Sequence, residues 1–213
     1  MMKVADVRVI IMCKAPVAGQ VKTRLMRRFS AARAAELHSA MATTVIERAI
    51  RLFEDVEIAA DDPGHAFFAA FGLPVKLQGE GDLGMRMQRQ LNQAFADGVD
   101  AVLLLGTDSP HMPETRLLEA AGLLHECNVV LGPVEDGGYD FVALSAAHRI
   151  FEAVQWSTPQ VLQQTLVNID ALKLSCRLLD TGFDVDHPAD VDRAIRAGWE
   201  HISKLNKSGN AGL

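Results

Sequence analysis

The sequence predicts an α/β protein: a single three-layer α/β/α domain built on a mixed, mostly parallel sheet. Short apolar runs that suit strands alternate with longer stretches of helical periodicity, which is typical of this class. Residues 101–105, AVLLL, are all apolar, as expected for a strand buried on both faces of a sheet. The 213 residues, 49% of them hydrophobic, suffice for one core. We expect the domain to span residues 1–200 and a flexible polar tail to follow at 201–213.

Strands are expected where short apolar runs stop at glycine, proline or charged residues. In chain order these runs lie at 7–12, 56–60, 75–77, 101–105, 129–133, 141–144 and 174–179. The run at 141–144 follows a Gly-Gly turn too closely for a helical crossover. We therefore expect the sheet to be mixed at this point.

Helices are expected in the stretches between most of these strands. In chain order they lie at 31–53, 63–71, 84–96, 113–124, 158–168 and 188–199. Ser30 is a suitable N-cap for the first helix, in which Leu37, Met41 and Val45 share one face. Pro113 and Pro188 are typical of first helical turns.

Charge and cysteine content exclude several classes of protein. The net charge is −6 and no basic block occurs, which disfavours general binding to nucleic acids or anionic membranes. The three cysteines, Cys13, Cys127 and Cys176, form no CxxC pair, so we expect a reducing compartment and buried Cys13 and Cys127. The chain has no apolar stretch of transmembrane length and no signal-peptide pattern. A cytoplasmic protein is expected.

Asp108 is the first candidate site residue. It lies just past the apolar run at 101–105, after the strand is stopped by Gly106 and before Pro110. The carboxyl edge of an open α/β sheet is where ligands bind, and a carboxylate there suits a divalent cation bridged to phosphate oxygens. Alternatively, Asp108 is a turn residue that caps the next helix.

A basic loop follows the first strand. The segment CKAPVAGQVKTRL, 13–25, carries Lys14, Lys22 and Arg24 among proline and glycine residues. Exposed backbone N–H groups and cations at the carboxyl end of a strand suit a di- or triphosphate. The segment matches neither the Walker A loop nor GxGxxG. The alternative is a solvated surface loop.

The segment QGEGDLGMRM, 78–87, is a second candidate for the nucleotide. Gly79, Gly81 and Gly84 permit a close approach of the backbone to a ligand, and Arg86 lies near enough in sequence to face the same cleft. The alternative is a flexible connection in which Asp82 caps the following helix.

Two further acidic turns follow later strands. In GPVEDGGYDFVAL, 132–144, Asp136 and Glu135 are expected at the same sheet edge as Asp108. Gly137, Gly138 and Tyr139 would then lie beside an acceptor substrate. The alternative is a tight turn with solvated acidic side chains.

In DTGFDVDHPADVDRA, 180–194, Asp184 and Asp186 alternate along an extended segment and so share a face. The alternative is an acid-rich helix start, which better explains Asp190 and Asp192. Opposite charges gathered at one edge are what a metal–nucleotide diphosphate site needs.

These segments in order, with LLGTDSP and WSTPQVL, resemble the small bacterial transferases of the GT-A, or nucleotide-diphospho-sugar transferase, superfamily. The nearest members are the arsenosugar-biosynthesis-type glycosyltransferases, also called radical-SAM/selenodomain-associated transferases. Molybdenum-cofactor and phospholactate nucleotidyltransferases are more distant relatives. The resemblance spans 7–195 and implies the GT-A fold.

The resemblance also implies roles for individual residues. Lys14, Lys22 and Arg24 would hold the nucleotide phosphates. Asp108 and Asp186 would hold a Mg²⁺ or Mn²⁺ ion. The acceptor pocket would be bordered by Gly137, Gly138 and Tyr139. His187 replaces the threonine of the relatives' DVDTP pattern. Asp108 lies in TDS rather than in the DxD motif of many sugar transferases, which counts against glycosyl relative to nucleotidyl transfer.

The leading hypothesis is metal-dependent transfer of a sugar from a nucleotide-diphospho-sugar to a small acceptor, with Asp136 as the general base. The alternative is nucleotidyl transfer from an NTP to a phosphate or carboxylate acceptor with release of pyrophosphate. A third hypothesis is a regulatory protein that binds a nucleotide without turnover.

Overall fold

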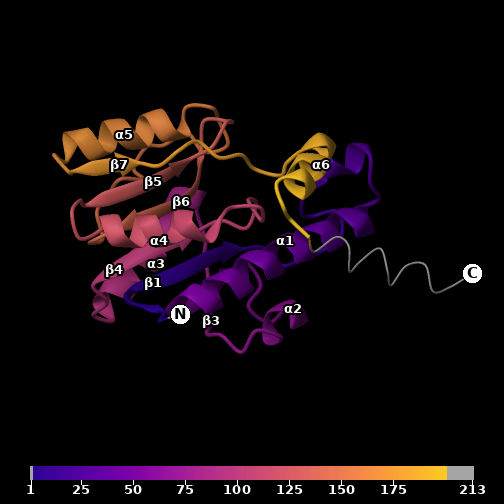
Figure 1. Cartoon of the computed structure of the whole chain (residues 1–213), viewed down its shortest axis with the longest axis horizontal. Helices are drawn as coiled ribbons and strands as arrows, with labels where there is room; N and C mark the ends of the chain where they lie inside the picture. The colour runs from indigo at the N-terminus through magenta and orange to yellow at the C-terminus, as the bar shows by residue number, and fades with distance from the viewer. Residues whose placement is uncertain (1, 201–213) are drawn as a thin grey trace, which may run out of the picture.

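The computed structural model describes residues 2–200, and the tail predicted at 201–213 lies outside them. Its strands form one seven-stranded sheet in the order β3-β2-β1-β4-β6-β5-β7, with β3 and β7 at opposite edges (Figure 1). The strands are β1 (Val4–Cys13), β2 (Phe53–Ala60), β3 (Val75–Leu77), β4 (Ala101–Leu105), β5 (Val129–Pro133), β6 (Tyr139–Leu144) and β7 (Cys176–Leu178).

Only β6 runs against the other strands of this sheet. β1 is parallel to β2 and β4, β2 is parallel to β3, and β5 is parallel to β7, whereas β6 is antiparallel to both β4 and β5. The short turn before β6 leaves no room for a crossover helix, so the mixed sheet predicted at this point is confirmed. The carboxyl ends of the other strands therefore meet at one edge.

Helices cover both faces of the sheet, as in a three-layer α/β/α fold. They are α1 (Ala31–Leu52), α2 (Ala66–Ala69), α3 (Leu83–Ala96), α4 (Glu114–Leu123), α5 (Val161–Ala171) and α6 (Pro188–Arg196), with a 3₁₀ helix η1 (Thr23–Arg27). Alternate residues of β1 show the layering: Ile11 joins the core cluster formed with α1, α2 and α4, whereas Ile10 joins the cluster formed with α3 and α5. The predicted fold class is confirmed.

Several element boundaries differ from the sequence-based prediction. The helix predicted from residue 158 begins at Val161, because Thr158 donates to the carbonyl of Gln155 and closes a turn. The last helix ends at Arg196 because Gly198 takes φ +98° and the N–H of Trp199 bonds back to Ala194. The 3₁₀ helix η1 was not expected from the sequence.

A third, smaller apolar cluster joins η1 and α1 to α6 and the segment before it. Leu25 of η1, Leu37 and Met41 of α1, Val185 just before α6 and Val191 within α6 are all buried in it. Figure 1 accordingly shows α6, in yellow, beside the indigo segment that follows β1 and away from α5. This packing places the basic loop against residues 184–187.

Cys13 and Cys127 are buried, as expected, and the three cysteines are free. Within residues 2–200, no helix combines the length and the apolar character that crossing a bilayer requires.

Candidate active site

A cleft at the carboxyl edge of the sheet gathers most of the predicted site residues. It consists of two overlapping cavities, of about 650 Å³ and about 490 Å³, which share Asp108, Asp140, Asp184 and Asp186 in their walls. The larger cavity, here the basic half, also has the cations Lys14, Lys22, Arg24 and Arg86 in its wall. The smaller cavity, here the acidic half, is also lined by Asp136 and by aromatic rings.

Hydrogen bonds between distant segments hold the acidic residues together. The carbonyl of Asp108 accepts the N–H of Val185 at 2.9 Å. Ser109 Oγ donates to the carbonyl of Phe183 at 3.0 Å and to Oδ1 of Asp184 at 2.7 Å. The turn after β4 is thereby fixed against the strand-like segment that precedes α6.

Lys22 lies between two of the predicted metal ligands. Its Nζ is 2.9 Å from Oδ1 of Asp108 and 3.0 Å from Oδ1 of Asp186, and it donates to the carbonyl of Val185 at 2.7 Å. Arg24 Nη1 contacts the other Asp186 oxygen, Oδ2, at 2.6 Å. Residues more than 160 positions apart in the chain thus form one charged cluster.

Burial strengthens this cluster. The Lys22 side chain is only 6% exposed. Burial by itself lowers the pKa of Lys22, but the charges of Asp108 and Asp186 outweigh it, so the pKa is raised. For Asp186, burial by itself raises the pKa. The positive charges of Lys22 and Arg24 outweigh the effect of burial, so the pKa of Asp186 is lowered. Lys22 is therefore charged, and Asp186 is ionised, at neutral pH.

The basic half rests on Gln78, which was not predicted as a site residue. Gln78 is buried and donates from Nε2 to the carbonyls of Ala59, at 2.8 Å, and Cys13, at 3.3 Å. Its Oε1 accepts a hydrogen bond from Arg86 Nη1 at 3.1 Å, which fixes this cation on the cleft wall. A polar side chain directly after a short strand is the signal that could have identified it.

The acidic half combines carboxylates with an aromatic wall. Tyr139, Phe141 and Trp156 line it, and Arg24 is the only lysine or arginine among its described lining residues. The Tyr139 ring meets Trp156 edge to face, with centroids 6.5 Å apart. Burial raises the pKa of Tyr139, so its phenol is neutral at physiological pH.

Two more carboxylates line the cleft: Asp184, named with Asp186 in the acidic turn at 180–194, and the buried Asp140, which was not predicted as a site residue. Burial, followed by the charge of Asp108, raises the pKa of Asp184 to about 7. Burial raises the pKa of Asp140 to about 6, although the nearby Arg116 lowers it in part. Asp140 could have been recognised as the one acidic residue in the otherwise apolar strand YDFVAL.

The structure brings most predicted site residues to the cleft, but not all of them. Its walls include Lys14, Lys22, Arg24, Asp108, Asp136, Asp186, Gly138 and Tyr139. Asp136 is exposed, and its Oδ1 accepts the N–H of Gly138 at 2.9 Å. Glu135 instead forms an ion pair with Arg193 at 2.6 Å.

Gly137 supports the acidic half from behind rather than lining it. Its φ is +89°, and an added Cβ would collide with the backbone carbonyl of Pro159. We predict that Gly137→Ala lowers the free energy of unfolding by about 3 kcal/mol, because backbone strain and overpacking add. Gly98→Ala is the matched control: φ is +87° with nothing within 4 Å, so strain alone costs about 1 kcal/mol. Equal losses of unfolding free energy in the two variants, measured by urea denaturation, would contradict a steric contribution from Pro159.

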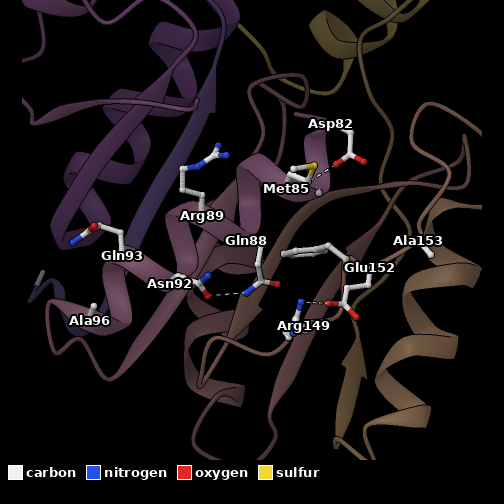
Figure 2. A pocket seen from close by; sticks show the side chains of 12 residues that line it. Asp82, Met85, Gln88, Arg89, Asn92, Gln93, Ala96, Arg149, Glu152 and Ala153 are labelled. Carbon is white, nitrogen blue, oxygen red and sulfur yellow. Dashed lines mark hydrogen bonds and ion pairs between the residues drawn. The ribbon is translucent and has the colours of Figure 1, made fainter. Parts of the chain in front are cut away.

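Gly84 lies outside the cleft. It is buried in the first turn of α3, where an added Cβ would be 2.8 Å from the Trp156 ring. Figure 2 shows the neighbouring groove, about 740 Å³, in which side chains of α3 such as Gln88 face Arg149 and Glu152. Its lining includes none of the clustered charges of the cleft.

The donor set of the cleft fits a hard divalent cation. Mg²⁺ commonly takes one or two carboxylates and completes its shell with phosphate oxygens and water, and Asp108 and Asp186 supply such a pair. Residues 2–200 contain no group of three or more metal-binding side chains, so the protein by itself supplies only part of a shell. One oxygen of each carboxylate is bonded to Lys22.

Comparisons with known proteins agree with this fold. A family model described as "Uncharacterized protein conserved in bacteria (DUF2064)" matches residues 37–158. No curated protein matches the chain. A protein of Desulfovibrio desulfuricans G20 assigned as a nucleotide-diphospho-sugar transferase is 29% identical, with a TM-score of 0.79, over 86% of this chain and 84% of that one.

Two nucleotidyltransferases are similar in fold alone. CMP:2-keto-3-deoxy-manno-octonic acid synthetase, solved with CTP, is 14% identical, with a TM-score of 0.60, over 90% of this chain and 97% of that one. A cytidylyltransferase of Leptospira borgpetersenii is 13% identical, with a TM-score of 0.54, over 85% of this chain and 78% of that one. The expected nucleotide-diphospho-sugar transferase fold is confirmed.

Proposed function

The chain belongs to the DUF2064 family and has the nucleotide-diphospho-sugar transferase fold, and we propose that it transfers a group from a nucleotide-activated donor. The group proposed is a sugar, moved from a nucleotide-diphospho-sugar to a small acceptor that carries no negative charge. The similar protein of Desulfovibrio desulfuricans G20 supports the donor class.

One observation carries the proposal: the cleft is divided by charge. Four aspartates and Arg24 line both halves. The basic half adds three cations, Lys14, Lys22 and Arg86, whereas the acidic half adds a fifth aspartate, Asp136. A donor diphosphate therefore fits the basic half, where cations and backbone N–H groups offset its charge. The acceptor fits the acidic half, against the rings of Tyr139 and Trp156.

Asp108 and Asp186 lie where the two halves meet and are the residues that would hold Mg²⁺ or Mn²⁺. When bound, the ion would offset the charge that the departing nucleoside diphosphate acquires. Arg24, beside Asp186, stabilises the same charge from the protein side.

Asp136 is the proposed general base. It is exposed at the acidic half, and its carboxylate accepts the acceptor's hydroxyl proton as that oxygen bonds to the anomeric carbon. The bond from the anomeric carbon to the diphosphate breaks, and the electron pair leaves with the diphosphate. Gly138 and Tyr139 border the acceptor.

Nucleotidyl transfer is the second candidate, because the cytidylyltransferases share the fold. In that reaction an acceptor oxygen attacks the α-phosphorus of an NTP and pyrophosphate leaves. A phosphate or carboxylate acceptor would have to enter the acidic half beside Asp136, Asp140 and Asp184, and like charges disfavour this.

The test is a product assay with Mg²⁺ or Mn²⁺, panels of nucleotide sugars and NTPs, and matched uncharged, amine, carboxylate and phosphate acceptors. We expect free nucleoside diphosphate from a nucleotide sugar, with uncharged or amine acceptors preferred and a chelator abolishing the reaction. Pyrophosphate released only from an NTP would support the second candidate. Calorimetric nucleotide binding without either product would indicate a regulatory binding protein instead.

A further inference from the structure

The ammonium group of Lys22 has no free proton. It has three N–H bonds to give, and it has three acceptors: Oδ1 of Asp108 at 2.9 Å, Oδ1 of Asp186 at 3.0 Å and the carbonyl of Val185 at 2.7 Å. The side chain is 6% exposed. Lys22 is therefore fully coordinated before any substrate binds.

This geometry conflicts with the roles proposed for the same residues. A phosphate oxygen needs a proton of Lys22, and a divalent cation needs the oxygens of Asp108 and Asp186. Neither interaction is complete while the ammonium remains between the two carboxylates. If the ammonium moves from the carboxylates to a phosphate, both become possible together.

We propose that Lys22 is a built-in counter-cation that blocks divalent cations from Asp108 and Asp186 until a donor phosphate draws it away. The proposal rests on the proposed function, because it assigns an order to that site: nucleotide first, then metal. The nearest oxygens of Asp108 and Asp186 both lie within 3.0 Å of Lys22 Nζ, and without a cation between them these two carboxylates would repel each other. Lys22 removes this repulsion in the free protein.

The surroundings of Lys22 permit such a movement. It lies in the basic loop, directly before η1. Residues 18–20 of the same loop are exposed, and Gly19 has open space around it. The Lys22 φ of +47° is a left-handed conformation that costs a non-glycine residue about 1–2 kcal/mol. The bonds to the carboxylates help to hold this conformation, and Lys14 and Arg86 attract a phosphate to the same half of the cleft.

The experiment measures binding of Mn²⁺ alone by electron paramagnetic resonance, with no nucleotide present. We expect weak binding to the wild-type protein and binding at least about tenfold tighter to Lys22→Met, because the carboxylates lose their internal cation. Lys14→Met is the matched control: it removes the same charge from the same half, but within residues 2–200 the ion pairs of Asp108 and Asp186 are with Lys22 and Arg24, not with Lys14. We expect its affinity to change by less than about twofold.

Two checks keep the result interpretable. Circular dichroism and thermal unfolding establish that each variant is folded, and Lys22→Gln, which keeps N–H donors but lacks charge, replaces the methionine variant if that variant is unstable. The proposal is overturned if Lys22→Met increases the affinity for Mn²⁺ no more than Lys14→Met does. The Mn²⁺-binding measurement involves neither a nucleotide nor turnover. A failure of the transferase assay therefore does not change its result, and a failure of the binding experiment does not decide the transferase activity.

Discussion

Asp108→Asn is expected to reduce the transfer rate by at least about a hundredfold while leaving the protein folded. The Asp108 side chain is 44% exposed, so its replacement leaves the packed core intact, and its one ion pair within residues 2–200 is with Lys22. An asparagine still accepts a hydrogen bond from Lys22, but it is a poor ligand for Mg²⁺. The measurements are product formation and calorimetric binding of the nucleotide with and without Mg²⁺.

Asp192→Asn provides the comparison for Asp108→Asn. It removes one negative charge from α6 at an exposed ion pair with Arg28, outside the cleft lining. We expect its activity and its Mg²⁺-dependent nucleotide affinity to equal those of the wild-type protein. Undiminished Mg²⁺-dependent affinity in Asp108→Asn would exclude Asp108 as a metal ligand.

Arg116→Met is expected to be the most destabilising of these substitutions, by about 3–5 kcal/mol near pH 8. Arg116 lies 3.5 Å from Oδ1 of Asp140, a side chain that is 4% exposed. It also donates to the carbonyls of Asp180 and Pro133 and lies over the Phe141 ring. Its loss leaves a buried carboxylate without a counter-ion, and chemical denaturation measures the cost.

The pH dependence identifies the electrostatic part of this effect. The pKa of Asp140 is raised to about 6 in the folded protein, so its contribution favours folding at low pH and is lost as the pH rises through about 6. Removing Arg116 raises this pKa further. The difference between wild type and Arg116→Met should therefore be about 1–2 kcal/mol near pH 5, from lost hydrogen bonds, and should grow as the pH rises.

Arg149→Met is the control for Arg116→Met. Arg149 pairs with Glu152, and these side chains are 76% and 59% exposed. We expect a loss below about 1 kcal/mol, with no dependence on pH between about 5 and 8. A destabilisation by Arg116→Met that is equal at both pH values would show that Asp140 is not held ionised by this arginine.

Local patterns were sufficient where one segment decides its own environment. The apolar run at β4 stops at Gly106, which placed Asp108 at the carboxyl edge, and the Gly-Gly turn before β6 predicted the mixed sheet. The side chain of Ser30 caps α1, and that of Asp82 caps α3, as their positions suggested. In each case the partner group is a few residues away.

Patterns failed where burial or a partner depends on distant segments. Asp140 was not expected in the site, and nothing near Asp184 in the sequence indicated an altered pKa. Burial by several elements raises both pKa values. Gly84 looked like a backbone approach to a ligand, but its neighbour is the Trp156 ring, which lies more than seventy positions later in the chain. Such contacts have no local signature.

The sequence by itself determined the α/β class, the mixed sheet and the edge at which charged residues collect, because strand and turn propensities act over a few residues. Only the tertiary structure decided which charges pair. It set the ammonium of Lys22 between Asp108 and Asp186 rather than toward solvent, because α6 packs on η1 through an apolar cluster formed by residues far apart in the chain. Which carboxylate an ammonium contacts depends on distances of a few ångströms, and only the packed core defines those.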